Sequence, residues 1–114
     1  MKKVSAYVRD DMASRVIEAL TAADFQDFTI IAAQRIIKGL AGADYQFSMA
    51  LGERFEPVAK LEVVCRDQNA GRLADLIRTA AFTGRRGDGM VFISPVEEAI
   101  HIVDGRRGEE GLGA

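Results

Sequence analysis

The chain switches between two hydrophobic periodicities, and the order of these switches constrains the fold more than any other feature. Four segments have the alternation or the β-branched and aromatic content typical of strands: residues 2–9, 28–37, 58–65 and 90–94. Two further segments, 12–23 and 73–80, carry apolar residues at the three- and four-residue spacing of amphipathic helices. The predicted order is strand, helix, strand, strand, helix, strand. Asp10, Asp11 and Asp67 are the predicted N-cap residues of the two helices.

This order predicts an α+β, ferredoxin-like βαββαβ fold, with one four-stranded antiparallel sheet and two helices on one face. The uncovered face is expected to stay fairly apolar, with Tyr7, Val64 and Phe92 on it. Such a face is normally covered by another subunit, so we expect an oligomer. The 114 residues (1–114) allow a single domain, and any sizeable ligand pocket is expected between subunits.

Residues 38–57 break the periodic pattern and are predicted to form a long flexible loop between the second and third strands. The segment contains three glycines and ends in Pro57. Loops of this length are uncommon in compact domains, and they are usually functional or disordered. Its scattered apolar residues indicate a surface that meets a partner, or an extension of the flanking strands. The tail, 104–114, has four glycines and is expected to be loosely ordered by itself.

The charge balance argues against binding of nucleic acid through bulk electrostatics. Lys and Arg total 15 while Asp and Glu total 17, so no strong basic field exists. The first and third predicted strands also lack the stacking aromatics of RNA-binding domains with this fold. No apolar run reaches the ~20 residues that span a bilayer, and the first residues lack the apolar stretch of a secretory signal. We therefore expect a cytoplasmic protein without direct membrane insertion.

Few residues in the chain are suited to catalysis or metal binding. The one cysteine, Cys65, excludes an internal disulfide and is expected to be a small core residue. The one histidine, His101, has no metal-ligand spacing around it and no obvious cysteine partner, so we predict neither an enzyme nor a bound metal. Two interpretations of His101 stay open: a pH switch, or an imidazole on a strand near a cleft.

The segment 83–93, TGRRGDGMVFI, is the most informative part of the chain. Glycines permit left-handed backbone and leave N–H groups unshielded, so this loop can wrap an anion, and its two arginines add positive charge. It is not a Walker loop, because no Gly-Lys-Ser/Thr follows. A plain helix-to-strand connection, with Asp88 and Gly89 making the turn, explains the same residues equally well.

Residues 83–100, TGRRGDGMVFISPVEEAI, resemble the nucleotide-binding loop and following strand of the PII signal-transduction proteins. The family pattern there is Thr-Gly-x-x-Gly-Asp-Gly-Lys, then Ile/Val-Phe. The resemblance covers essentially the whole chain, through MKKVSAYV, FTIIAA, PVAKLEVV and DGRRGEEGL. It implies a ferredoxin-like homotrimer with adenine nucleotides in three intersubunit clefts. Such proteins sense ATP, ADP and often 2-oxoglutarate, and a long loop binds transporters, enzymes or regulators.

The resemblance also implies roles for individual residues. Thr29, Glu62 and Val64 match positions that hold adenine and ribose. The phosphate loop corresponds to residues 87–89, and Lys38 replaces a basic Arg. The complete set of predicted nucleotide-binding residues is Thr29, Lys38, Glu62, Val64, Arg85, Arg86, Gly87, Asp88, Gly89, Met90 and His101.

Several cationic positions of the family are lost. The phosphate-binding Lys is Met90 here, and two tail-side arginines are His101 and Val103. Each lost charged contact weakens phosphate binding by about 1.5–3 kcal/mol. The arginines of the loop and the tail are candidate substitutes, or else solvated surface residues: Arg85, Arg86, Arg106 and Arg107. We therefore expect ADP, AMP or ATP as ligand, with ATP weakened.

The family's Gln that helps bind magnesium and 2-oxoglutarate is Gly39, so 2-oxoglutarate sensing should be weak or absent. The tyrosine that is uridylylated and the serine that is phosphorylated in the family correspond to Leu51 and Met49. Control by either modification is therefore not expected.

The favoured function is a non-enzymatic, PII-like regulatory trimer that senses an effector and acts on a partner through the 38–57 loop. The alternative is an interaction module that has lost ATP and 2-oxoglutarate sensing. Such a module would respond to another ligand, as in inorganic-carbon or metal transport.

Overall fold

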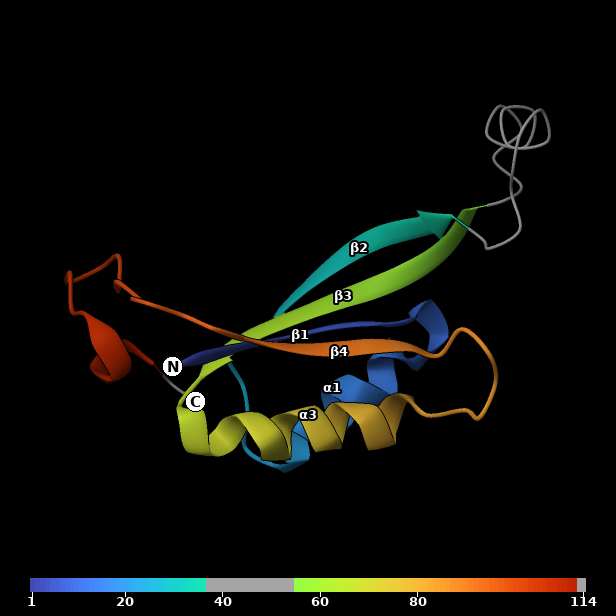
Figure 1. Cartoon of the computed structure of the whole chain (residues 1–114), viewed down its shortest axis with the longest axis horizontal. Helices are drawn as coiled ribbons and strands as arrows, with labels where there is room; N and C mark the ends of the chain where they lie inside the picture. Colours follow the sequence, from blue (N-terminus) through green and yellow to red (C-terminus); the bar gives the residue numbers. More distant parts are fainter. Residues whose placement is uncertain (37–54, 113–114) are drawn as a thin grey trace.

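The computed structural model describes residues 1–36 and 55–112. Within these ranges, four strands form one antiparallel sheet in the order β2-β3-β1-β4, and two α-helices lie on one of its faces (Figure 1). The strands are β1 (Lys2–Arg9), β2 (Thr29–Ile36), β3 (Phe55–Cys65) and β4 (Gly89–Pro95). The helices are α1 (Ala13–Ala22) and α3 (Asp67–Ala81), with two short 3-10 helices, Asp10–Met12 and Gly108–Gly111. The predicted ferredoxin-like fold is confirmed.

The register of the strands explains which side chains are buried. β1 is central, and Ala6 lies opposite Leu61 of β3 on one side and Val91 of β4 on the other. Side chains alternate between the faces of a sheet, so Val4 and Val8 share the face of Ala6, which is the helix face. All three β1 side chains are almost completely buried, as the alternation in the sequence predicts.

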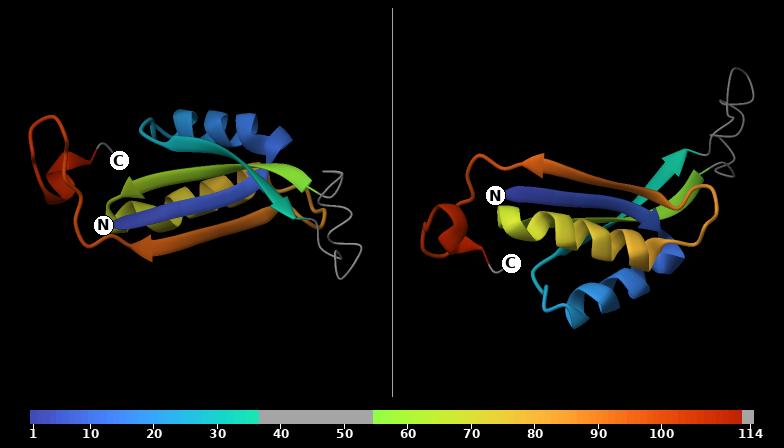
Figure 2. Two further views of the ribbon diagram at one scale, coloured as in Figure 1. Left: turned by 90° about the horizontal axis from the view of Figure 1, so that it is seen from above. Right: turned by 60° about the horizontal axis from the view of Figure 1, so that its bottom comes forward.

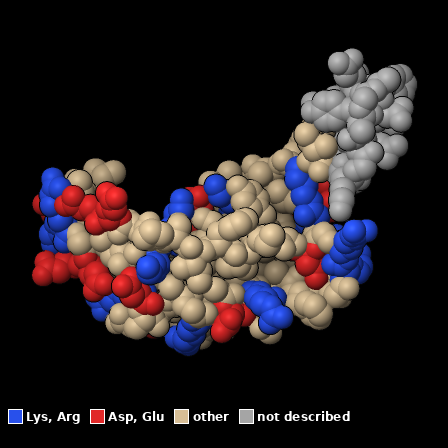
Figure 3. All heavy atoms as spheres, in the orientation of Figure 1, with Lys and Arg blue, Asp and Glu red and all other residues tan. Residues whose placement is uncertain are grey.

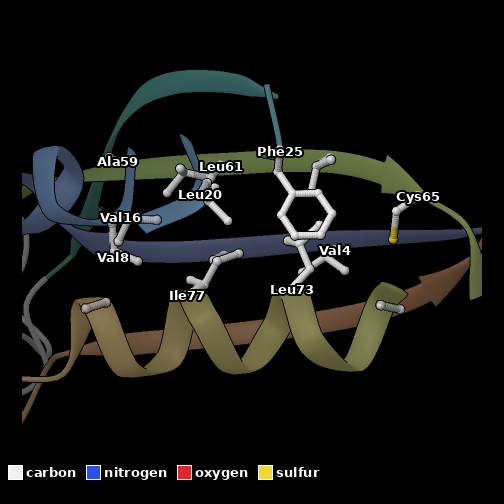
Figure 4. Close-up of a cluster of buried hydrophobic side chains, with 14 residues drawn as sticks. Val4, Val8, Val16, Leu20, Phe25, Ala59, Leu61, Cys65, Leu73 and Ile77 are labelled. Carbon is white, nitrogen blue, oxygen red and sulfur yellow. The ribbon is translucent and has the colours of Figure 1, made fainter. Parts of the chain in front are cut away.

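The core fills the layer between this face and the two helices (Figure 4). The helices α1 and α3 pack side by side beneath the sheet, as the second view in Figure 2 shows. The largest fully buried side chains come from every layer: Leu20, Leu61, Leu73, Ile77, Val4, Val16 and Cys65. Cys65 is a buried free thiol whose pKa is raised by burial, so its predicted role as a core residue is confirmed.

The helix starts differ from the prediction. Asp10 and Asp11 lie inside a 3-10 turn, and α1 begins after it at Ala13 without a side-chain capping hydrogen bond. Asp67 is the first residue of α3 rather than its N-cap. Its Oδ1 lies 2.8 Å from the amino-terminal ammonium group of Met1, and this contact holds the pKa of Asp67 below its usual value.

The face of the sheet opposite the helices carries the apolar side chains that the sequence placed there. Tyr7 and Phe92 lie on it in an edge-to-face contact with ring centroids 6.4 Å apart, and both are exposed. Val64 lies opposite Lys3 on the same face and is half-buried. We call this surface the open face.

The ends of the predicted loop and the tail also differ from the prediction. β3 begins at Phe55, so residues 55–57 of the predicted 38–57 loop are strand, while 38–54 lie outside the described residues. Pro57 is tolerated because it lies one residue beyond the last pair with β1, where β3 has β2 as its one neighbour. The tail is more ordered than predicted, since a bridge joins Ile100 to Arg107 before the final 3-10 helix.

Candidate functional site

The loop between α3 and β4 is built around the carboxylate of Asp88. Its Oδ2 accepts hydrogen bonds from the backbone N–H groups of Thr83 (2.7 Å) and Gly84 (3.0 Å), and the Thr83 hydroxyl donates to Oδ1. These donors, with the Thr83 hydroxyl first, hold the pKa of Asp88 far below its usual value. Asp88 is therefore an anionic clamp that closes the loop.

Two arginines from the sheet reach the same loop. Arg9 of β1 donates from Nε to Oδ1 of Asp88 (3.0 Å) and from Nη2 to the carbonyl of Arg86 (2.6 Å). Arg35 of β2 donates from Nη2 to the carbonyl of Gly87 (2.7 Å). Glu56 of β3 lies between them, because it accepts from Arg35 at 2.9 and 3.0 Å and is 3.5 Å from Nη1 of Arg9. These contacts tie the loop to Arg9, the last residue of β1, and to Arg35 near the end of β2. Glu56, near the start of β3, holds both arginines.

Two glycines of the loop have geometric reasons to be glycine. Gly89 has a φ of 113°, and a Cβ atom there would lie 1.8 Å from the carbonyl oxygen of Tyr7. Gly87 has a φ of 96°, and a Cβ atom there would lie 2.8 Å from Nη2 of Arg35. At Gly89 the loop backbone thus approaches β1 more closely than any side chain allows, while at Gly87 the positive φ favours glycine.

A pocket of about 530 Å³ opens at this loop on the open face of the sheet. We call it the loop pocket; its lining residues are Tyr7, Arg35, Arg85, Gly87, Asp88, Gly89, Met90 and Phe92. Basic side chains gather at the right-hand end of the molecule in Figure 3, with acidic ones between them. The pocket combines glycine backbone, two arginines and an apolar wall, an arrangement suited to a phosphorylated ligand with an apolar part.

A second pocket, of about 450 Å³, lies toward the other end of the sheet. We call it the tail pocket; its lining residues are Lys3, Asp27, Thr29, Glu62, Val63, Val64, His101 and Leu112. Glu62 is 3.0 Å from Nζ of Lys60 and 3.9 Å from Nζ of Lys3, and the hydrogen bond with Lys60 lowers the pKa of Glu62. An ionised Glu62 beside exposed Thr29 offers hydrogen-bond acceptors to a sugar or a base.

His101 lies at the start of the turn that leads into the tail, and not on a strand, where one of its two interpretations placed it. Its Nδ1 is 3.0 Å from Oδ1 of Asp104, and its backbone N–H donates to the carbonyl of Arg106 (2.8 Å). Arg106 binds Asp104 in turn, through its backbone N–H (3.0 Å) and its Nε (2.7 Å). The backbone N–H of Arg106, first among these donors, lowers the pKa of Asp104. The tail therefore presents His101 to the tail pocket in a fixed turn.

The predicted nucleotide-binding residues thus form two groups. Thr29, Glu62, Val64 and His101 share the tail pocket, while Arg85, Gly87, Asp88, Gly89 and Met90 share the loop pocket. The pockets have no lining residue in common, and Lys60, which lines neither, lies between Glu62 of the tail pocket and Tyr7 of the loop pocket. Arg86 is exposed on the loop and lines neither pocket, and Lys38 lies outside the described residues.

The sequence prediction missed Arg9, Arg35 and Glu56. Arg35 and Glu56 are a directly opposed pair in the β2–β3 register. That pairing was hidden because Glu56 fell inside the segment expected to be loop. The sequence did contain a signal for the two arginines. Side chains two positions apart in a strand share a face, so Arg9 lies on the same face as Tyr7, and Arg35 on the same face as Ala33.

The sequence of the whole chain is similar to a known protein family. A family model described as "Nitrogen regulatory protein P-II" matches residues 1–109. The chain belongs to the P-II family. The nitrogen regulatory protein P-II of Rhizobium meliloti (strain 1021) is 38% identical over 114 residues, covering 100% of this chain and 99% of that protein. That of Bradyrhizobium diazoefficiens is also 38% identical, with the same coverage.

A third relative has a different name. The "Nitrogen fixation nifHD region GlnB-like protein 1" of Methanothermococcus thermolithotrophicus is 32% identical over 115 residues, 98% of this chain and 100% of that protein. P-II proteins are signal-transduction regulators. In residues 1–36 and 55–112 of this P-II chain, no helix is long and apolar enough to cross a membrane, and no three potential metal-binding side chains cluster.

Proposed function

We propose that this P-II family chain is a cytoplasmic regulatory homotrimer that binds an adenine nucleotide in clefts between subunits. Nucleotide binding would control a transporter, an enzyme or a regulator through residues 38–57. The observation that carries the proposal is the division of the predicted nucleotide-binding residues between two separate pockets of one chain. A ligand that needs both groups is served by the loop pocket of one copy and the tail pocket of its neighbour.

The exposed apolar surface supports this assembly. On the open face Ile31, Met90 and Phe92 are 42–60% exposed, and in the turn just before the tail Ile102 and Val103 are 100% and 81% exposed. Side chains of this kind are normally covered in the working form of a protein. Contact between subunits buries both surfaces and brings the two kinds of pocket together.

The chemistry of the two pockets divides the ligand between them. The tail pocket offers the acceptors of Glu62 and Thr29 beside the apolar Val64, which suits a nucleoside. The loop pocket offers glycine backbone and arginines, which suit phosphates. Met90, in place of a cation, faces the same loop pocket. A triphosphate has the most charge to compensate, so ADP or AMP binds at least as tightly as ATP.

The role is regulatory rather than catalytic, in keeping with the family, and no metal ion is required for the nucleoside and loop contacts proposed here. Isothermal titration calorimetry with ATP, ADP, AMP and 2-oxoglutarate tests the proposal. We expect saturable binding of adenine nucleotides and weak or undetectable binding of 2-oxoglutarate with Mg-ATP. Absence of binding by every adenine nucleotide would favour an interaction module that responds to a different ligand.

Light scattering tests the assembly independently of the ligand. We expect a mass about three times the 12.4 kDa of one chain at micromolar concentration. A mass near that of one chain would contradict the shared cleft.

A further inference from the structure

We propose that Arg35 is a phosphate ligand of the loop pocket and supplies a cation that the sequence lacks at Met90. This inference rests on the proposed nucleotide site and names a specificity-determining residue within it. The predicted substitutes for the lost cations were arginines of the loop and the tail. Arg35 belongs to neither segment, and it reaches the loop from β2.

The position of Arg35 is suited to a ligand that sits on the loop backbone. Its Nη2 donates to the carbonyl of Gly87 at 2.7 Å. It lines the loop pocket with Gly87 and Met90, on the open face of the sheet. A guanidinium group presents donors in a planar fork that matches two phosphate oxygens. Ligand and arginine would therefore meet at the glycine backbone.

Arg9 is equally close to the loop but is more buried and does not line the loop pocket. Its Nε is bound to Asp88, its Nη2 to the Arg86 carbonyl, and its Nη1 lies 3.5 Å from Glu56. Its side chain is 14% exposed, against 33% for Arg35. Nη1 of Arg35 makes no hydrogen bond to the described residues. Arg9 is thus a positioning residue, and Arg35 has a donor to offer.

The charge of the cluster favours an anion. The side chains of Arg9, Arg35 and Arg85 lie at the loop with the two carboxylates of Glu56 and Asp88. The oxygens of Asp88 are already occupied by the Thr83, Gly84 and Arg9 donors. Three cations against two carboxylates leave one positive charge in excess, and the exposed Arg86 of the same loop adds a second, so the cluster favours an anion.

The test compares Arg35→Gln with Arg15→Gln, which removes an exposed arginine from α1 on the helix side of the sheet. Each protein is titrated calorimetrically with adenosine, AMP, ADP and ATP at one ionic strength. We expect Arg35→Gln to lower the affinity for ADP and ATP by about tenfold or more. Its affinity for adenosine should stay within about twofold of the wild-type value. The ADP affinity of Arg35→Gln should also depend less steeply on salt concentration than that of wild type. Arg15→Gln should bind like wild type.

A second pair of variants separates ligand binding from support of the loop. Arg35→Lys keeps the charge without the fork and should recover part of the lost ADP affinity. Glu56→Gln leaves Arg35 charged while weakening its tie to β3, so ADP should bind at least as well as to wild type. If Arg35 mattered through loop structure alone, Glu56→Gln would weaken ADP binding as Arg35→Gln does. A loss of adenosine affinity in Arg35→Gln as large as its loss of ADP affinity would mean that the substitution damages the whole site rather than one phosphate contact. Either result would overturn the inference.

Inorganic pyrophosphate distinguishes the two possible failures. If wild type binds nucleotides and Arg35→Gln binds them unchanged, the inference is wrong while the proposed function stands. If wild type binds pyrophosphate through Arg35 but no adenine compound, the anion site stands and the nucleotide proposal is wrong. Binding of neither pyrophosphate nor nucleotide would overturn both.

Discussion

Arg9 and Asp88 are 79 residues apart in the chain, yet Nε of Arg9 lies 3.0 Å from Oδ1 of Asp88. This contact joins the end of β1 to the loop that precedes β4. Asp88 also accepts the backbone N–H groups of Thr83 and Gly84, so one carboxylate fixes both ends of the loop. The loop conformation is therefore built into the fold and does not wait for a ligand.

The first prediction concerns this carboxylate. Asp88→Asn replaces an acceptor that serves two backbone donors, a hydroxyl and a guanidinium with a neutral amide. We expect the melting temperature to fall by several degrees and ADP affinity to fall about tenfold, because charge-assisted hydrogen bonds are lost. Asp75→Asn, at an exposed position of α3, is the matched control and should change neither quantity. Equal behaviour of the two variants in melting and titration would contradict the clamp.

The second prediction is the pH dependence of the same clamp. The lowered pKa of Asp88 means that its ionised form stabilises the fold. That stabilisation is fully present above the unfolded pKa of about 4 and is lost as the pH falls toward the folded pKa. Denaturant unfolding from pH 6 down to pH 2 should therefore show the gap between wild type and Asp88→Asn narrowing below about pH 4. A gap that stays constant over this range would mean that Asp88 does not hold the loop through its charge.

The third prediction contrasts two glycines. Gly89→Ala forces a Cβ atom to within 1.8 Å of the Tyr7 carbonyl oxygen at a φ of 113°, so we expect destabilisation of more than about 2 kcal/mol. Gly71→Ala lies inside α3 with open space around it and should stabilise the protein by about 0.5–1 kcal/mol. Chemical denaturation of both variants checks the opposite signs. A Gly89→Ala protein as stable as wild type would contradict the close approach of the loop backbone to the Tyr7 carbonyl.

The fourth prediction concerns the missing cation. Met90 is 60% exposed and faces the loop pocket, so Met90→Lys adds a charge where phosphates are proposed to bind. We expect ATP affinity to rise by about 1.5–3 kcal/mol, or roughly ten- to a hundredfold, with a smaller gain for AMP. Ala22→Lys, at the exposed end of α1, adds the same charge elsewhere and should leave ATP binding unchanged. Calorimetric ATP titrations that do not separate these variants would count against the proposed phosphate position.

The fold was predictable because its core depends on local periodicity. The alternation of Val4, Ala6 and Val8 placed the buried face of β1, and the spacing of Leu73 and Ile77 placed that of α3. The start of α3 was not predictable in the same way. Asp67 meets the amino-terminal ammonium group, a contact between distant parts of the chain that no local pattern encodes.

The site was predictable where it depends on glycine spacing and not where it depends on strand register. Gly87 and Gly89 predicted a loop with left-handed backbone conformations, and both residues have a positive φ in the structure. Arg35 and Glu56 become partners once β2 and β3 are paired as far as Ile36 and Phe55. The predicted third strand began at residue 58, two residues after Glu56, so the predicted pairing of the two strands did not include Glu56.

The central claim, one nucleotide site made from two copies of the chain, is tested most directly by mixing two disabled variants. Asp88→Asn impairs the loop pocket and Glu62→Ala impairs the tail pocket, so each protein alone should bind ADP poorly. When the two are co-expressed and assemble at random, about a quarter of the sites should combine an intact loop pocket with an intact tail pocket. We predict that calorimetry of the mixture recovers wild-type ADP affinity at about that fraction of sites. Recovery of no high-affinity sites in verified mixed assemblies would contradict the account.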